Sequence, residues 1–170
     1  TLVPATADAL SFLLVWELMA IGSTVLLLAD HATRQAVRTA TMWYAVMTHL
    51  SFLLLVAGFG VLIAAAGGTS WSRMTDIAEP AASLAFVLLV AGFATKAGLV
   101  PMHVWLPRAH PEAPSHASAA MSAAMVKMGL YGILLVTLRL LPSGPSWWAV
   151  VLVALGAISA LYGILQASVH

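Results

Sequence analysis

The sequence contains no cysteine, which excludes disulfide bonds, thiolate metal sites and iron–sulfur ligation from this chain. It also has few charges: they make up 8 % of the 170 residues, against about 25 % in an ordinary soluble domain. Six acids and seven bases cannot cover the surface of a soluble protein of this length. The net charge of +1, without a clustered basic face, excludes nucleic acid as an expected partner.

Hydrophobic residues, by contrast, make up 62 % of the chain and gather in long runs. A helix needs about 20 residues to cross the hydrocarbon core of a bilayer. Runs of that length are Ala9–Ala29, Met42–Ala66, Ala81–Leu106, Ala117–Leu138 and Trp147–Val169. They are continuous rather than alternating, which excludes a membrane β-barrel. The sequence therefore predicts an integral membrane protein: an all-α bundle of five transmembrane helices in a lipid bilayer.

The two ends indicate a part of a longer protein. The chain begins at Thr1 without an initiator Met, and no signal-peptide pattern follows. His170 comes directly after an apolar run, without a tail. We expect residues 1–170 to be a fragment of a single transmembrane domain.

Three ionisable residues, Glu17, Lys96 and Lys127, interrupt the apolar runs, and His49 lies within the second run. An ionised residue near the centre of a span costs about 2.5–3.5 kcal/mol on insertion scales. The structural explanations are helix packing, acid–base pairing and snorkelling to the interface. Polar contacts between membrane helices average only about 0.6 kcal/mol, however. We therefore favour a functional role for the set.

Pro101 follows Lys96 by five residues. Because its ring has no N–H, the carbonyl of Ala97 loses its helical partner, and we expect the third helix to be broken at Pro101. Unpaired backbone at membrane depth is tolerated where it is buried in protein or lines a wet cavity. Broken helices of this kind mark ion sites in transporters. A lysine beside the break can gain and lose a proton near neutral pH.

His116 and Lys127 are 11 residues apart at the fourth run. They share one helix face about 16 Å apart, so water would have to carry a proton between them. The small residues between them serve close helix packing equally well, and His116 is equally an ordinary residue at a helix start. His103 and His110 flank the same loop, but the spacing of the three histidines matches no metal-ligand pattern. We predict no metal site.

Glu17 and His49 each lie about one-third of the way into their predicted helices. If these helices are antiparallel neighbours, the two side chains lie at different depths, which leaves a direct contact open. A carboxylate in lipid is expected either to pair with a base or to be protonated.

The stretch KAGLVPMHVWLPRAHPEAPSHASAAMSAAMVKMGLYGI, with WELM around Glu17 and MTHL around His49, resembles a known signature. It is similar to that of the antiporter-like proton-translocating membrane subunits of respiratory complex I, Mrp-type cation/proton antiporters and membrane-bound hydrogenases. Within this family it is most similar to hydrogenase-4 component B and formate hydrogenlyase subunit 3. The resemblance covers essentially the whole chain. It implies that the five spans are part of an inverted-repeat, antiporter-like fold.

The resemblance also implies a role for each matching residue. Glu17 matches an acid that modulates the charge of the channel lysine, and Lys96 matches that lysine, on the broken helix. Lys127 matches a lysine that passes protons along the lateral hydrophilic axis. His49 stands where complex I relatives commonly have a lysine, a departure that leaves the strength of a Glu17–His49 pairing open.

Together these points predict a proton-translocating membrane subunit of a hydrogenase-type or NADH dehydrogenase-like respiratory complex, in a bacterial or archaeal cell membrane. Its partners would be the other membrane subunits. It would have no catalytic centre and no cofactor of its own. Its proton pathway would consist of Glu17, His49, Lys96, Lys127 and His116.

Two alternatives remain. One is a subunit of an Mrp-type Na⁺/H⁺ antiporter; hard cations favour oxygen ligands, so the buried cationic residues suit protons better than sodium. The other is an inert membrane anchor for a soluble redox arm, which leaves the buried charges unexplained.

Overall fold

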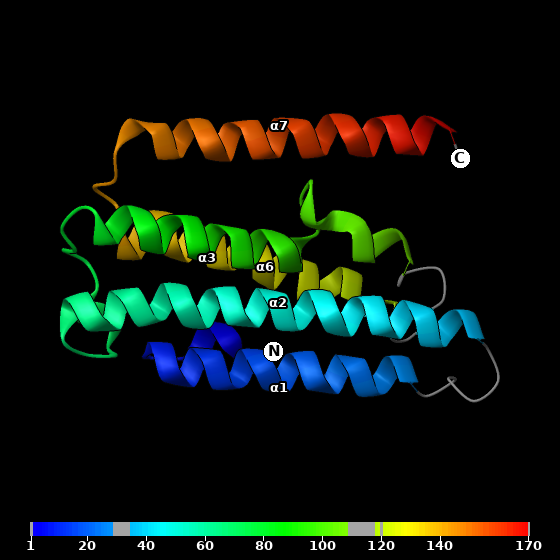
Figure 1. The fold of residues 1–170 in the computed structure, drawn as a ribbon, viewed down its shortest axis with the longest axis horizontal. Coiled ribbons are helices and arrows are strands. Elements are labelled where there is room, and N and C mark those ends of the chain that lie inside the picture. Colours follow the sequence, from blue (N-terminus) through cyan, green and yellow to red (C-terminus); the bar gives the residue numbers. More distant parts are fainter. Residues whose placement is uncertain (1, 29–34, 109–117, 120, 170) are drawn as a thin grey trace.

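Five helical spans lie side by side along the long axis of the molecule (Figure 1). The structure, a computed structural model, describes residues 2–28, 35–108, 118–119 and 121–169. Within these ranges the chain is helical apart from turns and one isolated bridge between Asp8 and Ser70. Each span is long and apolar enough to cross a membrane, which confirms the predicted all-α bundle of five helices.

The first two spans are α1, Ala9–Leu27, and α2, Gln35–Ala66. Asp8 caps α1, because its side chain accepts hydrogen bonds from the backbone N–H groups of Leu10 and Ser11, each at 3.0 Å. The hydrogen bonds from Ser11 also hold the pKa of Asp8 below its ordinary value. Helix α2 begins at Gln35 rather than at Met42, because polar residues that a hydropathy pattern assigns to a loop continue the helix.

The third span contains the break. Helix α3, Ala81–Ala97, ends at Gly98, whose φ of 71° places it in the left-handed region that glycine adopts readily. A short 3₁₀ helix, η4, then covers Met102–Trp105, with Pro101 immediately before it. The break was expected at Pro101; the helix ends before that residue, at the left-handed glycine.

The fourth span is irregular and lies close against α3. It consists of a π-helical turn η5, Met121–Met125, the helix α6, Val126–Leu134, and a second π-helical turn η6, Leu135–Leu140. A Cβ on Gly129 would lie 2.6 Å from the backbone nitrogen of Ala97 and 2.7 Å from the carbonyl oxygen of Phe93. Glycine therefore allows α6 to approach the α3 backbone next to Lys96.

The core is aromatic where α1, α2 and α3 meet. Phe12 contacts Trp16, Phe59 and Phe93, with ring centroids 5.5–5.9 Å apart. The last span is α7, Ser146–Val169, and its Trp148 stacks on Phe86 of α3 at 4.2 Å. Most of α7 is exposed.

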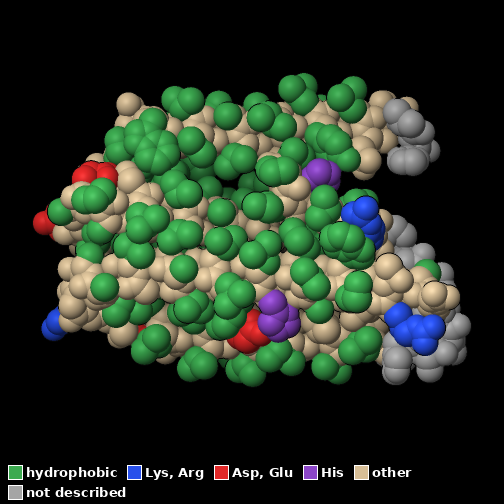
Figure 2. Space-filling model, viewed as in Figure 1, with side chains coloured by type: hydrophobic (Ala, Val, Ile, Leu, Met, Phe, Trp, Pro, Cys, Tyr) green, Lys and Arg blue, Asp and Glu red, His purple; other side chains and the backbone are tan. Residues whose placement is uncertain are grey.

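Hydrophobic side chains cover the middle of the visible face, and charged side chains gather at its two ends (Figure 2). One acidic side chain and one histidine lie next to each other within the apolar band (Figure 2). Glu17 and His49 form a contact of this kind. This pattern suits a bilayer, with polar ends at the two interfaces. The chain is an integral membrane protein.

Candidate functional site

Lys96 lies in the last turn of α3, directly before the break, and is 1 % exposed. Its ammonium nitrogen Nζ donates to the hydroxyl of Tyr44 at 3.0 Å and to Oγ1 of Thr48 at 2.7 Å. Nζ also lies 5.0 Å from the centroid of the Tyr44 ring. Both partners come from α2, so the packing of α2 on α3 buries the lysine and supplies its hydrogen-bond partners at the same time.

The segment after the break closes this site. The indole of Trp105 packs edge-on against Tyr44, with ring centroids 5.3 Å apart. Its Nε1 donates to the carbonyl oxygen of Thr95 at 2.8 Å, which satisfies a carbonyl in the last turn of α3. The gap between these side chains and Lys96 is too narrow for a water molecule. In this conformation protein atoms enclose the lysine beside the break and leave no room for water next to it.

The sulfur atom of Met125 links the surroundings of Lys96 to the first and fourth spans. The Tyr44 hydroxyl lies 3.5 Å from Sδ of Met125, to which it donates, and Oγ of Ser23 donates to the same sulfur at 2.7 Å. Met125 is the last residue of the π-helical turn η5, and Ser23 belongs to α1. Polar contacts therefore run from Lys96 across the bundle.

Glu17 and His49 contact each other, with 3.3 Å between Oε1 of the acid and Nε2 of the imidazole. The sequence placed them at different depths, but α2 begins earlier than predicted, so both residues lie near the middle of their helices. The contact is partly open on its outer side: the His49 side chain is 53 % exposed, whereas that of Glu17 is 20 % exposed.

The chemistry of this contact can be derived from the second ring nitrogen. Nδ1 of His49 lies 2.8 Å from the carbonyl oxygen of Ala45, which can only accept, so Nδ1 carries a proton. Nε2 then either donates a proton to a carboxylate or accepts one from a protonated carboxyl group. In both forms the Glu17–His49 contact contains one shared proton and has no net charge.

The other predicted residues are placed apart from these two centres. Lys127 is the second residue of α6 and is exposed in this chain. His116 lies outside the described residues, so its relation to Lys127 stays a prediction. Among the described residues, the ion pair of Glu17 is with His49, and no carboxylate is paired with Lys96.

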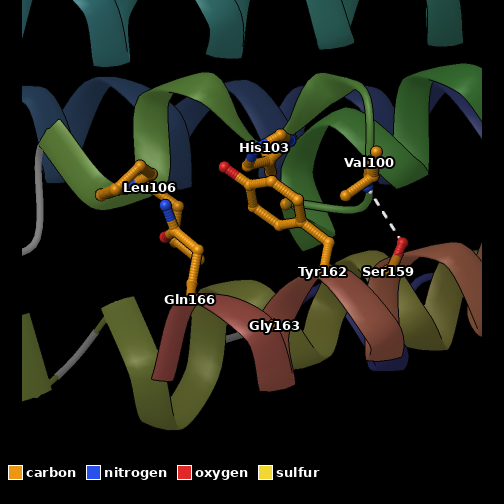
Figure 3. Close-up of a pocket in the computed structure, with 9 residues that line it drawn as sticks. Val100, His103, Leu106, Ser159, Tyr162, Gly163 and Gln166 are labelled. Atoms are coloured by element: carbon orange, nitrogen blue, oxygen red, sulfur yellow. Dashed lines mark hydrogen bonds between the residues drawn. The ribbon is translucent and has the colours of Figure 1, made fainter. Parts of the chain in front are cut away.

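A cavity of about 330 Å³ lies on the other side of the break, between η4 and α7 (Figure 3). His103 and Tyr162 meet there, with ring centroids 4.4 Å apart, and Ser159 and Gln166 line the α7 side. The backbone N–H of Val100 donates to Oγ of Ser159 at 3.0 Å, so α7 satisfies a backbone group that the break frees. Nδ1 of His103 is buried and has no partner among the described residues.

Sequence reasoning did not identify Tyr44, Thr48 and Trp105 as part of the site. The available signal was the spacing of Tyr44 and Thr48, four residues apart in an apolar run and therefore on one helix face. That signal does not indicate which helix the face meets.

Comparisons with known proteins agree with this architecture. A family model described as NADH:quinone oxidoreductase/Mrp antiporter, TM, matches residues 6–170. An uncharacterized protein of Mycobacterium tuberculosis is 54 % identical over 168 residues, which cover 99 % of this chain and 26 % of that protein. Hydrogenase-4 component B of Escherichia coli is 40 % identical over 164 residues, which cover 94 % of this chain and 24 % of that protein. The chain thus spans about a quarter of these relatives.

Two solved structures have a similar fold. A chain of the archaeal membrane-bound sulfane sulfur reductase superposes with a TM-score of 0.80 at 23 % identity, over 90 % of this chain and 32 % of that one. A chain of the Mrp complex from Dietzia superposes with a TM-score of 0.70 at 26 % identity, over 79 % of this chain and 26 % of that one.

Proposed function

This chain belongs to the NADH:quinone oxidoreductase/Mrp antiporter transmembrane family, and from that premise we propose that it is part of a proton-translocating subunit of a membrane complex. The identity to hydrogenase-4 component B supports a hydrogenase-type or NADH dehydrogenase-like complex. Other membrane subunits of such a complex would be its partners, and protons its transported ion.

The observation that carries the proposal is the environment of Lys96. A lysine that is 1 % exposed inside an apolar bundle is costly to retain. It stands at a helix break, and its partners are hydroxyls rather than an acid. Because no acid contacts this amino group, no fixed counter-charge holds it in its charged form, which suits a group that passes protons. An inert anchor would have no use for this arrangement.

We assign the remaining residues supporting roles. The Glu17–His49 contact holds one shared proton, so its loss or gain of a proton changes the net charge of the pair by one unit. That change alters the electrostatic cost of a charge on Lys96. Lys127 and His116 would pass protons to neighbouring parts of the full-length protein, and the exposed position of Lys127 on α6 suits that role.

An Mrp-type antiporter subunit is the second candidate function, and the similarity to the Mrp complex from Dietzia supports it. The two candidates share the proton path and differ in whether sodium is also carried. The dependence of proton uptake on sodium distinguishes them.

The test is proton uptake by vesicles that contain the full-length subunit in its complex. Lys96→Met keeps an unbranched side chain of similar length but removes the amino group that would carry the proton. We expect uptake to fall by at least about 100-fold, in the range found for loss of a group that transfers protons. Arg73→Met is the matched control, because Arg73 is an exposed base outside the spans. Equal uptake by both assembled variants would contradict the proposal.

A further inference from the structure

We propose that Tyr44 and Thr48 are positioning residues that hold the amino group of Lys96 in both of its protonation states. The lysine can then release and regain a proton without leaving its place. This inference rests on the proposed proton translocation. It identifies the side chains that allow Lys96 to change its protonation state in place.

The hydrogen-bonding capacity of the three groups carries the argument. A lysine ammonium can only donate hydrogen bonds, whereas the neutral amine has a lone pair and can also accept one. A hydroxyl donates and accepts, so it can bond to either form by rotating its proton. A carboxylate only accepts and adds a negative charge, so it would favour the ammonium alone. The two hydroxyls at 3.0 and 2.7 Å therefore allow a change of protonation state that an acid would oppose.

The surroundings fix the positions of these hydroxyls. Tyr44 and Thr48 are 1 % and 3 % exposed and lie one turn apart on α2. Trp105 packs on the Tyr44 ring, and Met125 offers its sulfur to the Tyr44 hydroxyl. Sulfur is a weak acceptor, so the hydroxyl can turn its proton toward Lys96 when the lysine becomes neutral, at little cost.

Among the described residues, no acid and no histidine contacts the amino group of Lys96 in addition to the two hydroxyls. Tyr44 is the titratable group in contact with Nζ. On the elements packed around the site, Glu17 of α1 is paired with His49 of α2, His103 of η4 contacts Tyr162, and Lys127 of α6 is exposed. The pH dependence of the site should therefore respond to removal of either hydroxyl.

The experiment is the pH profile of proton uptake by the full-length complex in vesicles, with Tyr44→Phe and Thr48→Val. Both changes keep the shape of the side chain and remove the hydroxyl. Hydrogen bonds to a charged group are stronger than those to a neutral one, so each loss favours the neutral amine. We expect the alkaline limb of the profile to move to lower pH by about one unit in each variant. Thr48→Ser, which keeps the hydroxyl, should retain the wild-type profile.

Thr41→Val is the matched control. Thr41 is a buried threonine on the same helix, but its hydroxyl donates to the carbonyl oxygen of Val37 at 2.8 Å. If Tyr44→Phe and Thr48→Val give the same profile as Thr41→Val, the positioning role is wrong. Loss of uptake in Lys96→Met together with unshifted profiles would overturn this inference and leave the proposed function standing. Full uptake by Lys96→Met would overturn the proposed function itself.

Discussion

Glu17 and His49 illustrate how one hydrogen bond determines the chemistry of a neighbouring contact. Because the carbonyl of Ala45 fixes the proton on Nδ1 of His49, the remaining proton lies between Nε2 and Glu17. Because the proton can lie on either partner, we propose that the pair stores one proton during translocation.

At the level of the residue, Glu17→Gln tests whether the proton shared by Glu17 and His49 takes part in proton uptake. The amide can still donate a hydrogen bond to Nε2 and so keep the contact, but it cannot exchange a proton. We expect proton uptake by the assembled complex to fall by at least about tenfold.

Glu79→Gln is the control for Glu17→Gln, since Glu79 is an exposed acid outside the spans that accepts from Ser83 at 2.9 Å. Wild-type uptake by the Glu17→Gln variant would remove the pair from the mechanism.

The sequence identified Lys96, Glu17 and His49 as candidates, and their roles stay predictions, but it did not identify the side chains that contact Lys96. Charges in apolar runs are visible in a single sequence, and Lys96 and Glu17 could be identified from their cost in lipid. Tyr44 and Thr48 are uncharged and common in membrane helices, so only the packing of α2 on α3 reveals them. His116 stays a prediction.

At the level of the element, α3 ends at the left-handed Gly98, before Pro101 is reached. A residue with a Cβ is disfavoured in the left-handed region by roughly 1–2 kcal/mol. In addition, a Cβ on Gly98 would lie 3.3 Å from Cδ2 of Leu106. We expect Gly98→Ala to lower the midpoint temperature of thermal unfolding of the complex in detergent and to reduce proton uptake, because the segment that carries Trp105 would shift.

Gly156→Ala is the control for Gly98→Ala. Gly156 lies within α7, and a Cβ there would meet no atom within 4 Å. If Gly98→Ala were as harmless as Gly156→Ala, the left-handed glycine would not be what shapes the break.

Hydropathy predicted the apolar parts of the helices well. It did not predict the polar residues by which a helix extends beyond its apolar run. The runs starting at Ala9 and Ala81 match α1 and α3 at their first residues. The start of α2 was missed because Gln35 to Thr41 form helix outside the apolar run, where hydropathy carries no signal. The depth of His49 depended on that start, so the contact with Glu17 could not be predicted.

At the level of the whole molecule, the proposal that protons rather than sodium ions are carried rests on the groups around Lys96 in the described part of the chain. Hard cations prefer several oxygen ligands, whereas the buried centre here contains an amino group between two hydroxyls. We expect proton uptake by vesicles to change by less than about twofold when potassium replaces all sodium. A saturable requirement for sodium would instead favour the Mrp-type function.

The central claim is that Lys96 passes a proton rather than holding a charge in place. Lys96→Arg separates these roles, because a guanidinium keeps the positive charge but does not deprotonate at accessible pH. The measurement is proton uptake by vesicles containing the full-length complex with Lys96→Arg, with assembly checked against the wild type. Our account predicts that uptake is abolished in the assembled variant. Uptake close to that of the wild type would show that a fixed positive charge is sufficient and would contradict the account.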